Sequence, residues 1–504
     1  MANPFQQGRQ PNQQEVQGLI NLLNAGQLTQ AESTAKSLLK SYPNTFILHN
    51  VLGIALDGQR KFDEAIHSYR KAASLQPALP DIHFNLGIAL ANIGRLDEAA
   101  VSYRKAISIQ PRFFEAHGNL GTILQKQGKL EEAVSSYRQA IRLNPDALGY
   151  FNMATALRDQ GKLEEAVESY RKAIAINAAY TDAHNNLGET LRDQGNMQDA
   201  VKSYQAALSI HPSHAGANYN LGEFLYLTKR YEEAISYFEK SQLEDWQERI
   251  LYCLYKAGKF EAFKQRLDQF ISRGKHVSPF LANLSTHYAI NFGTEDPYNF
   301  CRNAMDFVYQ NSIPELASQD SQLLSALLND IDSAQIAERK QGRLHNGIQS
   351  AGNLFKRQEA SFKALAALIR QEFERYRQQY SASGCELIQS FPSEFEFTSS
   401  WYVKMQRGGH LTSHFHELGW LSGAVYLKMP RKESGSDHGN FEFGTHGDDY
   451  PQLHTNFPAN NIAPAVGDII LFPSSLFHRT IPFDSDEERI CIAFDLRAPE
   501  PGYL

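Results

Sequence analysis

The stretch that decides the fold of the C-terminal region begins with His414-Phe-His416 and Trp420-Leu-Ser-Gly-Ala-Val-Tyr-Leu427. It ends with Gly467-Asp-Ile-Ile-Leu-Phe-Pro-Ser-Ser-Leu-Phe-His478 and Arg489-Ile-Cys-Ile-Ala-Phe-Asp495. Side chains at i and i+2 of an extended strand lie on the same side, so His414 and His416 can share one metal ion, with His478 arriving from a distant strand. This arrangement indicates a non-haem iron site.

Short β-rich runs alternate with turns around these motifs. The runs span residues 401–405, 420–429, 440–443, 468–472 and 489–496, and they are bounded by Gly, Pro, Asp or Asn. Evenly spaced short strands in a domain of this size predict a jelly roll, or double-stranded β-helix. We expect this domain to cover residues 386–504.

Along the last predicted strand, residues alternate between an apolar face and a second, mixed face. One face holds Ile490, Ile492, Phe494 and Leu496, and the other holds Arg489, Cys491, Ala493 and Asp495. We expect the apolar face to pack on covering helices, which leaves Arg489 inside the barrel. An inward guanidinium favours a carboxylate ligand, which it binds through two hydrogen bonds.

The first half of the chain is an internal repeat. Leu-Gly pairs, or their substitutes, begin at residues 52, 86, 120, 153, 187 and 221, so the steps are 34, 34, 33, 34 and 34 residues. Alanine, tyrosine and proline positions keep the same step. A period near 34 predicts helix-turn-helix repeats, in which Gly and Ala allow close helix approach, the aromatic fills the gap to the next repeat and Pro stops the second helix.

We expect the repeat superhelix to cover residues 14–274, with seven clear repeats up to about residue 246. A degenerate eighth repeat over residues 251–270 would cap the array, as terminal repeats must. The single 33-residue step predicts a shortened turn between Pro145 and Met153.

Between the repeats and the barrel the 34-residue period is lost, and we expect residues 275–385 to form a helical connector. Five apolar residues share one face of a helix predicted over residues 358–380, namely Phe362, Leu365, Ile369, Phe373 and Tyr376. We expect that face to pack on the outside of the barrel. The polar stretch 342–353 is a candidate lip over the active site.

The composition argues against several classes of partner. The chain of 504 residues is 42% hydrophobic with a formal net charge of -7, whereas nucleic acids and anionic membranes require a basic surface. The four cysteines are scattered without a CxxC pair, which is typical of a reducing compartment. We find no apolar leader and no apolar run of about 18 residues, so we expect a cytoplasmic protein with a disordered arm over residues 1–13.

These motifs resemble two known families. The Leu-Gly, Ala, Tyr and Pro positions resemble the tetratricopeptide repeat. The four C-terminal motifs resemble the 2-oxoglutarate and iron(II)-dependent oxygenases, specifically a family often joined to tetratricopeptide repeats. The resemblance implies a multidomain chain, in which an all-α repeat superhelix is followed by a helical connector and a double-stranded β-helix.

The second resemblance implies roles for the site residues. His414 and His478 would bind iron(II), and Arg489, eleven residues beyond His478, would hold the far carboxylate of 2-oxoglutarate. His416 occupies a slot that most of the superfamily fills with Asp or Glu; since three neutral imidazoles can hold iron(II), His416 is the third candidate ligand. Tyr426 is a candidate for a hydrogen bond to 2-oxoglutarate, and a packed core tyrosine fits equally. Molecular oxygen is the implied second cosubstrate, with ascorbate as a candidate reductant.

Four other polar residues near the motifs receive no metal role. Glu417 points to the opposite face of a regular strand from His416. His410, His438 and His446 are expected to be loop histidines exposed to solvent.

Asparagine precedes the Leu-Gly pair five times in register, at Asn85, Asn119, Asn152, Asn186 and Asn220. This slot lies on the first helix of each repeat, which in the family lines the concave groove, and the series resembles the asparagine ladder of the protein O-GlcNAc transferases. A ladder of carboxamides can bind an extended peptide backbone without reading its sequence. The alternative is that Asn is simply a frequent consensus residue at this slot.

Together the resemblances imply a dioxygenase that hydroxylates a protein or peptide side chain presented by the repeat groove. The domain layout is similar to that of aspartyl/asparaginyl β-hydroxylase. Two alternatives stay open. One is a non-catalytic repeat scaffold with an inactive barrel, and the other is a three-His, cupin-like dioxygenase or isomerase that does not use 2-oxoglutarate. In the latter, Arg489 should matter little to activity.

Overall fold

The computed structural model describes residues 10–497, apart from residues 244, 273, 275–276, 319, 334–335, 337, 340–341, 418, 432 and 434. The chain divides into two compact units, Met1–Phe224 and Leu225–Leu504. Most of the arm predicted over residues 1–13 lies outside the described residues. The first helix begins at Gln13, where the Asn12 side chain accepts from the Glu15 N–H and the Glu15 carboxylate accepts from the Asn12 N–H.

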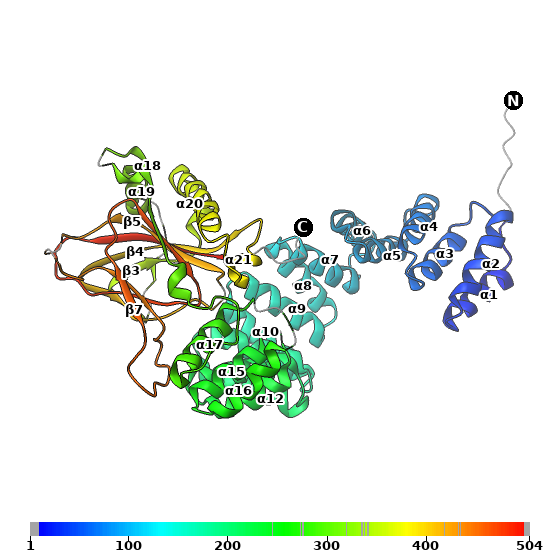
Figure 1. Ribbon diagram of the computed structural model, residues 1–504. Helices are drawn as coiled ribbons and strands as arrows, with labels where there is room; N and C mark the ends of the chain where they lie inside the picture. The colour runs from blue at the N-terminus through cyan, green and yellow to red at the C-terminus, as the bar shows by residue number, and fades with distance from the viewer. Residues whose placement is uncertain are drawn as a thin grey trace. The chain divides into compact units, whose positions relative to one another are not determined.

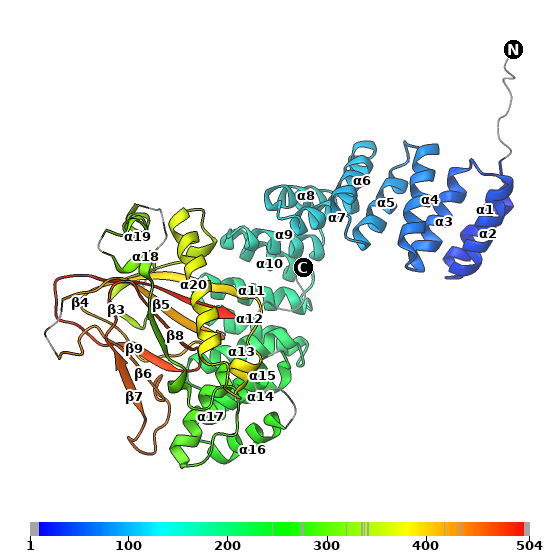
Figure 2. The ribbon, with the colours of Figure 1, turned by 45° about the horizontal axis from the view of Figure 1, so that its top comes forward.

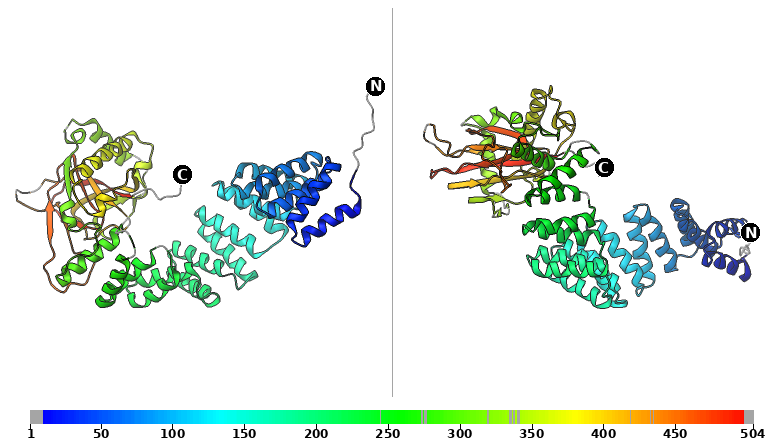
Figure 3. Two further views of the ribbon diagram at one scale, coloured as in Figure 1. Left: turned by 45° about the vertical axis from the view of Figure 1, so that its right-hand side comes forward. Right: turned by 60° about the horizontal axis from the view of Figure 1, so that its bottom comes forward.

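Antiparallel helix pairs build the first unit (Figures 1 and 3). They are α1 (Gln13–Asn24), α2 (Leu28–Ser41), α3 (Phe46–Gly58), α4 (Phe62–Leu75), α5 (Pro80–Asn92), α6 (Leu96–Ile109), α7 (Phe114–Lys126), α8 (Leu130–Leu143), α9 (Ala147–Asp159), α10 (Leu163–Ile176), α11 (Thr181–Asp193) and α12 (Met197–Ile210), followed by α13 (Ala215–Leu227). Each pair corresponds to one predicted repeat, which confirms the helix-turn-helix array.

The shortened turn is also confirmed. Three residues separate α8 from α9, whereas four residues separate α6 from α7. The side chain of Asp146 caps α9 by accepting from the Gly149 N–H at 2.7 Å. An aspartate at this position satisfies one of the free N–H groups of the first turn, so α9 can begin immediately after the shorter connection.

Glycine allows the two helices of a repeat to approach closely. A Cβ atom at Gly53 would lie 2.5 Å from the ring of Tyr69, and one at Gly188 would lie 2.5 Å from the ring of Tyr204. Any larger residue would displace the tyrosine, so the glycine and the aromatic are needed together. This contact lies within one repeat, whereas we predicted that the aromatic fills the gap to the next one.

Four helices open the second unit. These are α14 (Tyr231–Ser241), α15 (Trp246–Lys256), α16 (Phe260–Ile271) and α17 (Pro279–Phe292). The pair α15 and α16 matches the degenerate repeat predicted over residues 251–270. Helix α17 packs on the strand region that follows, where Phe280 stacks on Phe415 with ring centroids 5.9 Å apart and the Asn283 amide donates to the Ser475 carbonyl at 2.7 Å.

Two antiparallel sheets form the rest of the second unit. The larger has the order β1-β8-β5-β10-β4-β3-β2, and the smaller has the order β7-β6-β9. The strands are β1 (Tyr309–Ser312), β2 (Glu338–Arg339), β3 (Leu344–Ser350), β4 (Glu396–Leu411), β5 (Leu421–Lys428), β6 (Phe441–Gly444), β7 (Ala459–Ile462), β8 (Asp468–Pro473), β9 (Phe477–Thr480) and β10 (Arg489–Arg497). The predicted jelly-roll class is confirmed.

Three strands of the larger sheet come from residues 275–385, where we predicted only helices and loops. Strand β1 pairs with β8, β3 pairs with β4, and β2 pairs with β3. The candidate lip over residues 342–353 is therefore mainly a strand of the sheet. Its sequence, Leu-His-Asn-Gly-Ile-Gln-Ser, shows no apolar alternation, because His345 and Asn346 are exposed and Gln349 lines the polar cavity.

Helix α20 (Ala360–Gln379) covers the outside of the larger sheet, as predicted (Figure 2). All five residues of the predicted apolar face are buried, and Phe373 packs on Phe494 of β10 with ring centroids 6.4 Å apart. The remaining short helices are α18 (Pro314–Ala317), α19 (Gln322–Ser333) and α21 (Glu386–Gln389). The four cysteines are free and buried. Among the helices that the structure describes, none has the length and apolar character needed to cross a membrane.

Candidate metal centre

Three histidines from distant parts of the chain meet in the strand region. One ring nitrogen from each of His414, His416 and His478 lies within 4.8 Å of the others. The backbones of His414 and His478 form an antiparallel bridge, in which the two N–H groups donate to the opposite carbonyls at 3.1 and 2.8 Å. This bridge places the third imidazole beside the sequence-adjacent pair.

The residue between the paired histidines shows why both rings face the same way. Phe415 points to the other side of the chain, where it packs on Phe280 of α17 and on Phe477 of β9. The chain has left β4 at this point, but it keeps the alternation expected of an extended segment. The apolar anchor at Phe415 therefore fixes the direction of the two imidazoles.

All three imidazoles use Nδ1 for a bond within the protein. Nδ1 lies 2.8 Å from the Thr412 carbonyl in His414 and 3.2 Å from the Leu476 carbonyl in His478, and in His416 it contacts the carboxylate of Asp495. These oxygens only accept, so Nδ1 carries the proton and the lone pair of Nε2 is left for a metal.

Burial keeps two of these histidines neutral. Burial, followed by the influence of the neighbouring His416, lowers the pKa of His414 to about 3. Burial, followed by the influence of His414 and His416, also holds the pKa of His478 well below its usual value. Neutral imidazole is the form that binds metal, so the cluster needs no deprotonation near neutral pH.

Arg489 is a buried cation with no carboxylate partner among the described residues. Its Nη1 lies 3.8 Å from the Met405 sulfur and 3.7 Å from the Cys491 sulfur, and its guanidinium lies 5.0 Å from the ring centre of Tyr426. Within the part of the chain that the structure describes, its Nε atom has no hydrogen-bond partner. A buried, incompletely paired guanidinium is costly unless an anion satisfies it.

The histidine cluster and Arg489 line one cavity of about 710 Å³. The inward face predicted for the last strand lines this cavity as well, through Arg489, Cys491, Ala493 and Asp495. A second cavity of about 690 Å³ adjoins it and shares Arg343, His478 and Arg479. The first cavity therefore holds the cation and the imidazoles, and the second provides space on the other side of His478.

The residues present fit iron(II) and 2-oxoglutarate. One ring nitrogen of each histidine lies within 4.8 Å of the other two, and imidazole nitrogen is a suitable ligand for iron(II). The orphaned guanidinium of Arg489 suits a carboxylate of a small dianion in the same cavity. Tyr426 is buried beneath that guanidinium, so its ring supports the cation through its face.

The other polar residues of this region lie as follows. Glu417 lines the same cavity but pairs with Arg249 of α15 at 3.1 Å and is not part of the histidine cluster. His438 is exposed, as predicted. The prediction of solvent exposure is wrong for His410 and His446, since both are half-buried. The ring of His410 stacks on that of His345, and His446 lies 2.8 Å from the buried His287.

Asp495 was missed as a member of the site by sequence reasoning. Burial raises the pKa of its carboxyl, but the interaction with His416 and hydrogen bonds from His416, Ser422 and Ser399 outweigh burial and hold the pKa below its usual value. The alternation of the last strand did place Asp495 inside the barrel. A carboxylate inside a cavity requires a donor, and this signal could have identified it.

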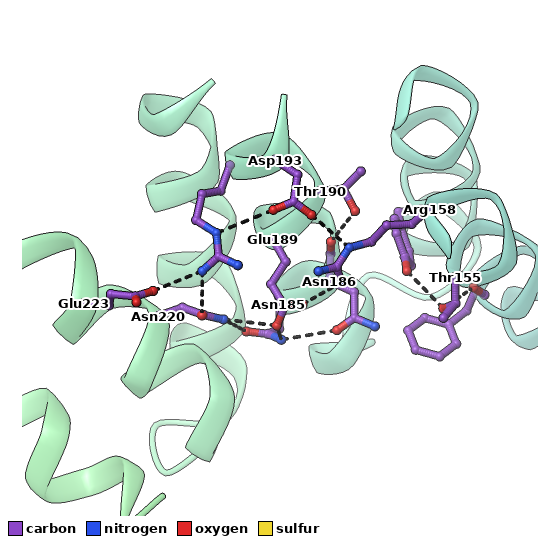
Figure 4. Close-up of polar contacts among 12 residues, drawn as sticks. Thr155, Arg158, Asn185, Asn186, Glu189, Thr190, Asp193, Asn220 and Glu223 are labelled. Carbon is purple, nitrogen blue, oxygen red and sulfur yellow. Dashed lines mark hydrogen bonds and ion pairs between the residues drawn. The ribbon is translucent and has the colours of Figure 1, made fainter. Parts of the chain in front are cut away.

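The asparagine series lies on the first helices of the repeats, α5, α7, α9, α11 and α13. Asn220 donates to Asn185 and to Glu189 at 3.1 and 3.2 Å, within a network that continues to Arg158 and Glu223 (Figure 4). Asn186 accepts from Asn185 at 3.2 Å. Among the described residues, no side-chain hydrogen bond is found for Asn85 or Asn152. Asn119 hydrogen-bonds Tyr103, so within the described part of the chain Asn85 and Asn152 are the members of the series without a side-chain hydrogen bond.

Comparison with known families agrees with this architecture. Residues 399–495 match the family described as "Putative 2OG-Fe(II) oxygenase". Models of the tetratricopeptide repeat match residues 50–112, 114–146, 154–191 and 185–248. The chain is thus a tetratricopeptide repeat protein joined to a domain of this 2-oxoglutarate and iron(II) oxygenase family.

Solved structures are similar to part of the chain. The crystal structure of MamA is 25% identical, with a TM-score of 0.32, and the match covers 32% of this chain and 95% of that one. YrrB, titled a TPR protein with an unusual peptide-binding site, is 22% identical with a TM-score of 0.34, over 36% of this chain and 95% of that one. PilF of Pseudomonas aeruginosa is 18% identical with a TM-score of 0.37, over 42% and 96%. No curated protein matches the chain.

Proposed function

We propose that this protein is a 2-oxoglutarate- and iron(II)-dependent dioxygenase that hydroxylates a side chain of a protein or peptide. The observation that carries the proposal is the buried guanidinium of Arg489, whose Nε atom has no partner in the described chain, in the same cavity as the three clustered imidazoles. When bound, iron(II) and 2-oxoglutarate would activate molecular oxygen, so that one oxygen atom would enter a substrate C–H bond and the other would enter the succinate formed as 2-oxoglutarate loses carbon dioxide.

In this proposal His414, His416 and His478 hold the metal. Their Nδ1 contacts prevent the rings from rotating, so the three Nε2 atoms are preorganised before the metal arrives. Three protein ligands leave open positions on a metal that can take six, and these are the positions needed for cosubstrates.

Arg489 selects the cosubstrate. A carboxylate that binds Arg489 loses its hydrating water but gains charge-assisted hydrogen bonds in a buried site. The carboxylate also neutralises the buried positive charge of Arg489. We therefore prefer an enzyme that uses 2-oxoglutarate to a three-His enzyme that does not. The latter gives no reason for the protein to bury the charge of Arg489.

Aromatic side chains keep water from the reacting groups. The rings of Phe441 and Phe472 lie 5.7 and 4.6 Å from that of His478, and both residues are buried. Apolar walls beside the metal protect a reactive site from side reactions with solvent.

The repeats are proposed to present the polypeptide substrate. Tetratricopeptide repeats offer an extended surface, and the carboxamides of Asn85 and Asn152 are free to bond a peptide backbone. Within the second unit, the segment that carries the metal ligands contacts α15, where Glu417 pairs with Arg249, and α17, where Phe415 stacks on Phe280. A substrate bound near α15 could thereby influence the metal centre.

The test is 2-oxoglutarate consumption by the purified full chain. We expect iron(II)-dependent formation of succinate, slow without substrate and faster when a hydroxylatable peptide or protein is added, with a mass gain of one oxygen atom on that substrate. His478→Ala is the matched inactive control. Absence of succinate from protein that demonstrably holds iron, with or without candidate substrates, would show that the proposal is wrong.

A further inference from the structure

The carboxylate of Asp495 is held beside the histidine cluster by residues of three strands. It lies on β10 and contacts Nδ1 of His416. Ser422 of β5 donates to its Oδ1 at 2.7 Å, and Ser399 of β4 donates to its Oδ2 at 2.9 Å. The hydroxyl of Ser422 also lies 2.7 Å from that of Ser474. Both carboxylate oxygens are therefore engaged, and the group is aimed at the back of one imidazole.

This contact distinguishes His416 from the other two histidines. His414 and His478 each bond a neutral backbone carbonyl two residues earlier in the chain, whereas His416 bonds a charged carboxylate from a distant strand. The difference falls at one position only. It is the position where a two-histidine, one-carboxylate iron site places its charged ligand.

We propose that Asp495 is a positioning residue for the metal, on the assumption that the three histidines bind it as in the proposed function. Its hydrogen bond keeps the proton of His416 on Nδ1 and fixes the ring so that Nε2 faces the metal. It also draws the Nδ1 proton toward the carboxylate, which makes Nε2 a stronger donor. The cluster of three imidazoles thus keeps one unit of negative charge next to the metal.

A direct ligand role for Asp495 is disfavoured by the same geometry. The group of ligand atoms that lie within 4.8 Å of one another contains the three histidines and no carboxylate of the described residues. The oxygens of Asp495 are already used by His416, Ser422 and Ser399. Binding the metal directly would break these bonds.

The test compares metal binding by the wild type, Asp495→Asn and a control, Asp468→Asn, in the full chain. Asp468 is a buried aspartate of β8 whose partners, Gln310 and the Ala465 N–H, lie outside the cluster. Cobalt(II) is the probe, since its visible absorption reports the ligand environment and its affinity is measurable by competition with a chelator. We expect Asp495→Asn to weaken cobalt(II) binding by about 10–100-fold and to shift the visible bands. We expect Asp468→Asn to change neither.

Thermal unfolding of each metal-free variant separates positioning from folding. If Asp495→Asn melts like the wild type and keeps wild-type cobalt(II) affinity and bands, the inference is overturned. If Asp495→Asn does not fold, Ser399→Ala provides the test, because it removes a hydrogen bond to Asp495 and Ser399 contacts no histidine of the cluster. A loss of cobalt(II) affinity in Ser399→Ala supports the inference. Unchanged affinity and unchanged visible bands oppose it. Asp495→Glu should recover part of the affinity that Asp495→Asn loses.

The result is distinguishable from failure of the proposed function. If the wild type binds cobalt(II) and Asp495→Asn binds it weakly, the positioning role stands even when no succinate is formed with iron(II). If the wild type forms succinate and Asp495→Asn binds metal unchanged, only the positioning role fails. A wild type that binds no metal contradicts both.

Discussion

Replacing Arg489 with methionine should make the metal-free protein more stable and at the same time abolish its binding of 2-oxoglutarate. Arg489 is 2% exposed, and its Nε atom has no hydrogen-bond partner among the described residues. Methionine is apolar, unbranched and flexible, so it can fill the space beside the sulfurs of Met405 and Cys491. The substitution therefore removes a buried charge without leaving a large void.

The size of both effects follows from the contacts. A buried polar group left unsatisfied costs about 1–3 kcal/mol, and the contact with the Tyr426 ring returns about 0.5–2 kcal/mol. The net gain on replacement is about 1 kcal/mol, which raises Tm by about 2–4 °C for a domain of this size. A bidentate carboxylate contact comprises two charge-assisted bonds of about 1.5–3 kcal/mol each. Losing at least about 3 kcal/mol weakens 2-oxoglutarate binding by at least about 100-fold.

The assay is thermal unfolding of metal-free protein together with calorimetric titration of 2-oxoglutarate into protein loaded with cobalt(II). Arg407→Met is the matched control, because Arg407 is exposed and pairs with Asp484 on the surface at 2.9 Å. The control should change neither quantity by much. A fall of several degrees in the Tm of Arg489→Met, or an affinity within a few-fold of the wild type, would refute the idea that Arg489 is a cation kept in place for an incoming carboxylate.

Three further predictions concern other parts of the chain. Gly188→Val should destabilise the first unit by about 1–3 kcal/mol in denaturant unfolding, because a Cβ there lies 2.5 Å from the Tyr204 ring; Gly18→Ala, with open space around it, should not destabilise. Burial lowers the pKa of His287 to about 3, below the value of about 6.5 in the unfolded chain, so stability falls as the pH drops from about 6.5 toward 3. At pH 5 this amounts to about 2 kcal/mol, and urea unfolding of His287→Gln at pH 7 and 5 should show a correspondingly smaller acid loss than the wild type; an equal loss would contradict the assignment. Combined replacement of Asn85, Asn119 and Asn152 by alanine should raise the KM for a polypeptide substrate and leave substrate-free succinate formation unchanged, whereas an unchanged KM would favour the consensus-residue interpretation.

Periodic features of the chain were predictable from the sequence. The 34-residue step located the helix pairs and even the shortened turn before α9, because every repeat packs the same residue types at the same positions of its two helices. The alternation over 489–496 separated a cavity face from a face that packs on α20, because neighbouring strand residues point in opposite directions.

Features that depend on distant partners were not predictable in the same way. Strand β3 was missed because its residues show no apolar alternation: His345 and Asn346 are exposed, and Gln349 lines the cavity. His446 was predicted to be exposed, because the sequence around it does not reveal its contact with His287 of the distant helix α17. Similarly, the spacing of the histidines suggested a shared metal, but the pairing of His416 with Asp495 required the register of β10 against β4 and β5.

The central claim is that the three histidines and Arg489 together form a site for iron(II) and 2-oxoglutarate. It is tested most directly under anaerobic conditions, by adding iron(II) and 2-oxoglutarate and recording the visible metal-to-ligand charge-transfer band. We predict a band in the wild type that is weakened in both His478→Ala and Arg489→Met. A wild type that holds iron(II) tightly but gives no band on addition of 2-oxoglutarate would contradict the claim.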